Sequence, residues 1–147
     1  MFLPIHYPDL QVLLKDDEPI PADMVLMAIG VSPETTLAKK IGLPVCIHSR
    51  DAEKDTLDIL KNNGQMLGVI HCYAYGVKTM QELVKLGYYF GVGGTCTYKN
   101  NVELRDAIRK MPLERIVLET DCPFLTPDAV RRQRNDSSKI KYVIEEI

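Results

Sequence analysis

The sequence predicts an α/β fold built from repeated strand–helix units. Its 147 residues suit a single domain with a core of its own. Apolar runs recur along the chain about 25 residues apart, which is the length of one strand plus one helix. Each run contains or adjoins a cysteine. The runs are Pro44–His48, Gly68–Cys72, Tyr88–Thr97 and Arg115–Cys122.

Amphipathic stretches after these runs predict the helices. Asp51 is expected to cap a first helix, which Gly64 ends, and Gly76–Leu86 forms a second. Asn100 or Asn101 opens a third, whose apolar residues are Val102, Leu104 and Ile108. A last helix carries apolar residues at i, i+3, i+4 and i+7, with the chain stopping at its end, so we expect a truncation there. These residues are Ile140, Val143, Ile144 and Ile147.

Residues 1–43 have a different pattern. Leu10–Leu14 and Met24–Gly30 are interpreted as strands, separated by the turn-rich segment Lys15–Ala22. Thr35–Ile41 is interpreted as a short helix ended by Gly42. The expected fold is therefore a two-stranded segment followed by the strand–helix units.

The charge balance argues against nucleic-acid binding through bulk charge. Lys and Arg total 18 against 20 Asp and Glu, for a net charge of −2. A local basic groove or a metal-assisted phosphate site stays open. No run has the length of a membrane span, and Met1–Leu3 is too short for an export signal. The four cysteines form no CxxC pair, so we expect reduced thiols, in small core positions, in a cytoplasmic protein.

Three polar residues occupy equivalent places at the ends of predicted strands. His48 ends Pro44–His48, His71 ends Gly68–His71, and Asp121 ends Ile116–Asp121. The carboxyl ends of parallel strands open on one side, so these side chains are expected to converge. Each alone is more often a core or capping residue, but three together favour a first shell for Zn²⁺, Mn²⁺ or a related ion.

Other polar residues have two open interpretations. Glu119, two residues before Asp121, would face the same way, either as a second carboxylate for metal and general-base chemistry or as a buried ion-pair partner. The arginines after Asp121 are either a phosphate-binding loop or a solvated one. They are Arg131, Arg132 and Arg134. His6 is expected to be an exposed loop residue.

Aromatic residues gather in two of the runs. Tyr89 and Phe90 are expected in the core. Tyr73 and Tyr75 follow His71 and would lie on the rim, where stacking on a nucleic-acid base is an alternative to packing. No glycine-rich phosphate loop of the GxGxxG or GxxxxGKS type occurs.

Long segments of residues 44–147 resemble the TatD family of metal-dependent deoxyribonucleases, which are amidohydrolase-like barrels. The matching segments are LPVCIHSRDA at 43–52, GVIHCY at 68–73, YFGVGGT at 89–95, IVLETDCPFLTP at 116–127 and RND at 134–136. The resemblance implies half of a (β/α)8 TIM-type barrel, of about four units. It also implies hydrolysis of phosphodiester bonds in DNA with a divalent metal, which is Zn²⁺, Mg²⁺ or Mn²⁺.

The resemblance also implies roles for particular residues. The family's metal ligands match His48, His71 and Asp121. Asp121 would in addition orient or deprotonate the attacking water, and is the expected catalytic residue. Arg50 and Arg134 are the expected contacts to substrate phosphate.

Two family motifs are missing from the sequence. There is no strand with a His-x-His pair, and no Gly-Glu-Ile-Gly-Leu-Asp segment, whose glutamate bridges two metals in the family. We therefore expect at most one metal, and weak or lost activity. Half a barrel would also leave strand edges and an apolar inner face open, which favours a homodimer.

Residues 9–43 resemble a different family. The segments DLQVLL at 9–14 and IPADMVLMAIGVSPETTLAKKIGL at 20–43 are similar to flavin-dependent pyridine-nucleotide disulfide reductases, especially the coenzyme A-disulfide reductase and NADH oxidase branch. That family's cofactor motifs are absent, so no flavin or NAD is expected. The combination predicts a chimera, natural or engineered, and the alternative to a nuclease is a chimera that folds but has no catalytic activity.

Overall fold

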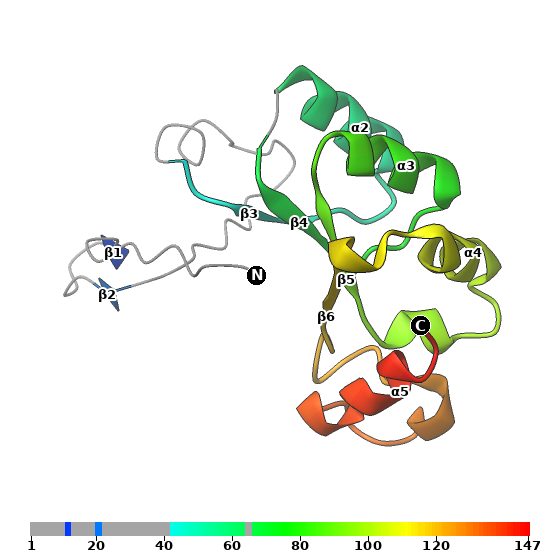
Figure 1. Cartoon of the computed structure of the whole chain (residues 1–147). Coiled ribbons are helices and arrows are strands. Elements are labelled where there is room, and N and C mark those ends of the chain that lie inside the picture. Colours follow the sequence, from blue (N-terminus) through cyan, green and yellow to red (C-terminus); the bar gives the residue numbers. More distant parts are fainter. Residues whose placement is uncertain (1–10, 13–19, 22–41, 64–65) are drawn as a thin grey trace.

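The centre of the molecule is a four-stranded parallel sheet. The structure is a computed structural model, and it describes residues 11–12, 20–21, 42–63 and 66–147. The strands lie in chain order, β3-β4-β5-β6 (Figure 1). Their bounds are Val45–His48 for β3, Gly68–His71 for β4, Tyr89–Val92 for β5 and Ile116–Leu118 for β6. This order of parallel strands confirms the predicted α/β class of strand–helix units.

Helices alternate with the strands. The α-helices are α2 (Glu53–Asn62), α3 (Val77–Lys85), α4 (Val102–Lys110) and α5 (Ile140–Ile144). Short 3₁₀ turns are η1 (Gly94–Thr97), η2 (Leu113–Arg115), η3 (Asp128–Val130) and η4 (Ser137–Lys139). Among the described residues, none of these helices is long and apolar enough to cross a membrane.

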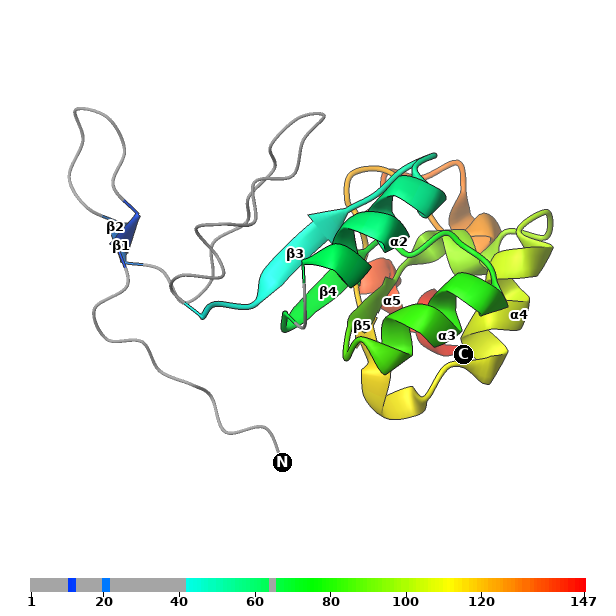
Figure 2. The same ribbon diagram turned by 90° about the horizontal axis from the view of Figure 1, so that it is seen from above.

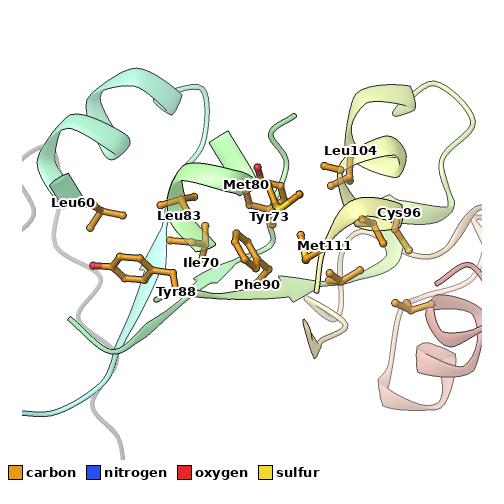
Figure 3. Close-up of a cluster of buried hydrophobic side chains, with 14 of the residues drawn as sticks. Leu60, Ile70, Tyr73, Met80, Leu83, Tyr88, Phe90, Cys96, Leu104 and Met111 are labelled. Carbon is orange, nitrogen blue, oxygen red and sulfur yellow. The ribbon is translucent and has the colours of Figure 1, made fainter. Parts of the chain in front are cut away.

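The hydrophobic core lies between the sheet and the helices. The view in Figure 2 shows α2 passing over β3 and β4, and α3 beside β5. Figure 3 shows the buried side chains of the strands meeting those of the helices. Ile70 of β4 and Phe90 of β5 are fully buried there, against Leu60, Leu83 and Leu104. Burial of these side chains is the main stabilisation of the fold.

The other face of the sheet is open. Side chains alternate along a strand, so Val69, next to Ile70, points to the opposite face and is half-buried. Tyr89, next to Phe90, is likewise half-buried, and Val117 of β6 is 44% exposed. None of the described helices covers these side chains as α2, α3 and α4 cover the core face.

Several elements are shorter than the sequence predicts. In the apolar run Tyr88–Thr97, only β5 is a strand. The last four residues, Gly94–Thr97, form the 3₁₀ turn η1. The run Ile116–Asp121 holds only β6, which ends at Leu118. Glu119 and Asp121 therefore follow the strand rather than belong to it. Asp51 does not cap α2, since Ala52 is its N-cap residue.

Some residues that the apolar pattern predicts to be buried are exposed in the structure. Val102, at the first turn of α4, is 67% exposed, while Leu104 and Ile108 are buried as predicted. In the last helix Val143 is buried, but Ile144 and Ile147 are exposed. A short helix contacts the core through only part of its apolar face.

Individual cysteines and tyrosines also depart from the predictions. Cys96 is buried as predicted, whereas Cys122 is exposed, because it lies in the loop after β6. Tyr73 is not a rim residue: it is buried and packs edge-on against Phe90, with ring centroids 5.0 Å apart. The prediction of a rim position for Tyr73 is therefore wrong.

The N-terminal segment is described at two places. Strand β1 (Gln11–Val12) pairs antiparallel with β2 (Ile20–Pro21). Strand β1 falls in the predicted strand Leu10–Leu14, but β2 falls in the segment predicted as a turn. The predicted strand Met24–Gly30, the predicted helix Thr35–Ile41 and His6 lie outside the described residues.

Candidate metal centre

His48 and His71 stand side by side because of the strand register. The parallel pair β3–β4 aligns Val45 with Gly68 and, three residues further on, His48 with His71. Equal positions on adjacent parallel strands point to the same face, so both imidazoles lie on the open face. Their ring centroids are 5.9 Å apart. His71 is half-buried, whereas His48 is exposed.

Two carboxylates hold the ring of His71 from opposite ends. Nδ1 donates to Glu119 Oε2 at 2.8 Å, and Nε2 lies 3.2 Å from Asp121 Oδ1. The second oxygen of Glu119, Oε1, accepts from the backbone N–H of Cys72 at 2.6 Å. An ionised carboxylate only accepts, so the Glu119 contact places a proton on Nδ1. A carboxylate on one imidazole nitrogen is the usual device that fixes the orientation of a metal-binding histidine.

Glu119 reaches His71 across an intervening strand. Glu119 follows β6, His71 lies on β4, and β5 runs between them. Gly91 of β5 lies one residue beyond the Ile70–Phe90 pair, beside His71. A Cβ atom at Gly91 would overlap the carboxylate of Glu119. The missing side chain therefore leaves the space through which Glu119 contacts His71.

The donor set fits a divalent cation. When Nδ1 alone carries a proton, the lone pair of Nε2 and the carboxylate of Asp121 face each other at 3.2 Å. Two electron-rich groups this close require a proton or a cation between them. Imidazole nitrogen and carboxylate oxygen are both ligands for Zn²⁺ or Mn²⁺. Within residues 42–63 and 66–147, no three His, Cys, Asp or Glu side chains already form a metal-binding group.

The two cysteines near the centre have raised pKa values. Burial raises the pKa of Cys72 to about 11, and the negative charges of Glu119 and Asp121 add to this. Burial, with a contribution from Glu119, also raises the pKa of Cys46. Both thiols therefore stay protonated near neutral pH in the metal-free chain, and neither is a candidate nucleophile.

Hydroxyl groups fix the loop that follows His48. Ser49 is buried, and its Oγ lies 2.5 Å from both Thr56 Oγ1 and Tyr75 Oη. Tyr75 is thereby tied to the end of β3. Next in the chain, the side chain of Arg50 is 84% exposed and lies 3.8 Å from Asp51. This arrangement leaves the guanidinium of Arg50 available at the rim.

The arginines after Asp121 lie on the surface. Arg131 stacks over the ring of Tyr98 at 4.3 Å and lies 3.4 Å from Asp128. Arg132 and Arg134 are exposed. Exposed guanidinium groups of this kind are suited to contact an anionic ligand.

Two residues of the centre have no signal in the hydrophobic pattern, although both lie in segments that carry the family resemblance. In the sequence, Gly91 looks like an ordinary glycine within a strand. Its role is to leave space for the carboxylate of Glu119, which comes from the segment after β6. Asn135 lies in a polar loop, yet it is buried and hydrogen-bonded to the loop that carries Asp121. The pair of Glu119 and Asp121 has a detectable signal, namely their spacing of two residues.

A protein-family profile described as "TatD related DNase" matches residues 32–147. The match includes residues 32–43, which were expected to belong to a reductase-like segment. The region that matches the family therefore begins before residue 44.

Similar proteins include several described as metal-dependent hydrolases. The chain is 40% identical to "Uncharacterized metal-dependent hydrolase YabD" of Bacillus subtilis over 116 aligned residues. This alignment covers 78% of this chain and 46% of the relative. It is 37% identical over 111 residues to "Uncharacterized metal-dependent hydrolase YcfH" of Escherichia coli, covering 74% of this chain and 42% of the relative. The chain thus spans less than half the length of these relatives.

Solved structures give the same result. The crystal structure of YJJV, a TatD homolog from Escherichia coli, superposes with a TM-score of 0.69 at 34% identity, over 75% of this chain and 43% of the other. A TatD family hydrolase from Entamoeba histolytica has a TM-score of 0.63 at 23% identity, over 74% and 44%, and supports the fold alone. The four-stranded sheet is thus part of a TatD-type barrel, and the chain belongs to the TatD family of metal-dependent hydrolases.

Proposed function

We propose that this chain hydrolyses phosphodiester bonds in DNA with the help of a divalent metal ion. The observation that carries the proposal is the contact between His71 Nε2 and Asp121 Oδ1 at 3.2 Å, with His48 on the adjacent strand. Family membership supports the reaction class. His48, His71 and Asp121 are the proposed ligands, and Zn²⁺, Mg²⁺ and Mn²⁺ are the candidate ions.

The protein groups have separate tasks in this proposal. A bound divalent ion would acidify a water molecule and offset charge on the phosphoryl oxygens. His71 presents Nε2 because Glu119 holds Nδ1, and Asp121 orients the water or accepts its proton. Arg50 and Arg134, both exposed, are the proposed contacts to the substrate phosphates. Activity is expected to be weak, because the residues that complete a two-metal site are missing from the sequence.

Cleavage and metal content of the purified full chain test this proposal together. Fluorescent DNA, single- and double-stranded, would be incubated with Mn²⁺, Mg²⁺ or Zn²⁺, and metal content measured by elemental analysis. We expect slow metal-dependent cleavage that His71→Ala abolishes along with the bound metal. His6→Ala is the matched histidine control and should leave both unchanged.

Three outcomes oppose the proposal. Equal cleavage by the wild type and by His71→Ala would point to a contaminating nuclease. A wild-type chain that takes up no ion would remove the metal site. Metal binding without cleavage would favour the alternative of a folded, inactive chimera.

We also propose that two copies of the chain pair through the open face of the sheet. In the described part of the chain, β3 and β6 are the edge strands of a parallel sheet. A twofold axis along the strands would place β6 of one copy beside β3 of the other, keep all strands parallel and continue the barrel. An apolar groove of about 290 Å³ on this side supports the pairing; its lining includes Pro44, Leu67, Val69, Tyr89 and Val117.

A charge on the open face tests the pairing. Val117→Lys should shift the mass measured by light scattering at micromolar concentration from dimer to monomer, because the ammonium group would be buried at the interface. Val102→Lys is the control, since Val102 is exposed on the helix-covered side. A wild-type monomer would contradict the proposal.

A further inference from the structure

The loop that carries Asp121 is held by a residue from a later segment. Asn135 is only 2% exposed, although it lies in a polar stretch. Its Nδ2 group donates to Thr120 O at 2.5 Å and to Phe124 O at 2.5 Å. Its own backbone N–H donates to Pro123 O at 3.3 Å. One buried side chain therefore bonds to the backbone on both sides of Asp121.

The orientation of this amide is unambiguous. Both groups that it faces are carbonyl oxygens, which only accept, so the NH₂ end must point at them. Its Oδ1 atom is buried and has no hydrogen-bond partner within the described part of the chain. The amide orientation thus satisfies both N–H donors and leaves the buried carbonyl oxygen without a hydrogen bond, which costs stability.

Asp121 needs such support because of its backbone. Its φ angle is +52°, in the left-handed region, and it lies beyond the end of β6 at Leu118. No strand pairing fixes the residue there. A left-handed residue persists only where its surroundings hold it. The bonds to Thr120 O and Phe124 O, with the turn bond from Phe124 N to Asp121 O at 3.0 Å, supply that restraint.

We propose that Asn135 is a positioning residue, which holds the carboxylate of Asp121 against Nε2 of His71 and so sets the affinity of the metal centre. The inference rests on the proposed metal site and deepens it. In this proposal Asn135 is neither a ligand to the ion nor a contact to the substrate. It acts through the backbone of residues 120–124, and it also ties the arginine loop, whose last residue is Arg134, to that segment.

Metal affinity of the full chain tests the role of Asn135. Asn135→Asp keeps the shape of the side chain but replaces both donors with acceptors that repel the two carbonyls. Titration with Co²⁺, followed by its visible absorption bands, or with Zn²⁺ by calorimetry, should show affinity about 10- to 100-fold lower, as is typical for groups that orient ligands. Asn135→Ser, which loses the reach to both carbonyls without adding charge, serves if Asn135→Asp fails to fold.

A matched control separates positioning from general stability. Thr126 is a buried residue of the same loop, and its Oγ1 donates to Gln133 O at 3.0 Å, away from Asp121. Thr126→Val should lower the melting temperature but leave metal affinity within about twofold of the wild type. Equal loss of affinity in the Thr126 and Asn135 variants, or unchanged affinity in the Asn135 variants, would overturn the inference.

A second measurement is independent of metal binding. Amide hydrogen exchange in the metal-free chain should be at least about tenfold faster at Phe124 in Asn135→Asp than in the wild type, and unchanged in Thr126→Val. If the wild type bound no metal, the proposed function would fail while this exchange experiment still decided the role of Asn135. Unchanged exchange at Phe124 would overturn that role.

Discussion

The two faces of the sheet differ in what their side chains do. On one face Ile70 and Phe90 are fully buried under helices. On the other, neighbouring residues of the same strands, Val69 and Tyr89, are half-buried, and His71 meets two carboxylates. Because side chains alternate along a strand, one short sequence serves both faces. The covered face supplies the stability that holds the polar groups of the open face in register.

The largest expected loss of stability comes from a substitution on the helix-covered face of the sheet. Ile70→Ala should lower the free energy of unfolding by about 2–5 kcal/mol, through lost burial and the cavity left behind. Val69→Ala, one residue away on the open face, should cost well under half as much when measured in the Val117→Lys background, in which the proposed dimer is dissociated. Urea unfolding followed by circular dichroism measures both, since the chain contains no Trp. Equal losses in that background would contradict the difference between the two faces, whereas a larger loss for Val69→Ala in the wild type is expected from the proposed dimer.

A methyl group at Gly91 tests the open face. Gly91→Ala should displace Glu119, release Nδ1 of His71 and lower metal affinity about 10- to 100-fold. Gly76→Ala is the matched control, since a Cβ there has room, at 4.0 Å from Glu103. Metal titration of both variants measures the effect. Affinity of Gly91→Ala equal to that of the control would show that the contact between Glu119 and His71 is dispensable.

The smallest expected effect lies on the outer surface of the covering helices. Glu82 of α3 lies 2.7 Å from Lys85 and 2.9 Å from Lys61 of α2. Lys85, followed by Lys61, lowers the pKa of Glu82 from 4.5 to about 2. The folded pKa lies below the unfolded one, so this stabilisation is present above about pH 4.5 and is lost as the pH falls towards 2.

Glu82→Gln should therefore lower the urea midpoint slightly at pH 7, and the difference from the wild type should shrink below pH 4.5 and in high salt. Asp106→Asn is the control, because Asp106 pairs with Lys110 of its own helix at 2.8 Å and, within the described residues, has no ion pair with a second element. A difference that grew on acidification would contradict the assignment.

The sequence allowed the arrangement of strands and two histidines to be predicted. Apolar runs at regular spacing indicate parallel strand–helix units, and parallel strands align their ends, so His48 and His71 were expected together. Asp121 was expected at a strand end, but β6 stops at Leu118 and a left-handed backbone brings Asp121 to His71 instead. Spacing along a strand cannot reveal a turn after it.

Contacts between distant segments account for most of the rest. The buried amide of Asn135 lies among polar residues, so neither periodicity nor composition marks it. Val102 follows the apolar pattern of α4 but is exposed at the first position of the helix. Cys122 shares the spacing of the other cysteines, yet its loop carries it to the surface.

Gly91 also bears on how mutational data for this protein should be interpreted. Strands two places apart in a sheet are separated by about 9.6 Å, a span that the middle strand's side chains normally fill. At Gly91 no side chain fills that span, and the side chain of Glu119 extends through it to contact His71. The backbone of Gly91 does not require a glycine, since its φ angle lies outside the left-handed region. A saturation screen should thus report Gly91 as intolerant, although it carries no chemistry, and its variants should be rescued only by shortening residue 119.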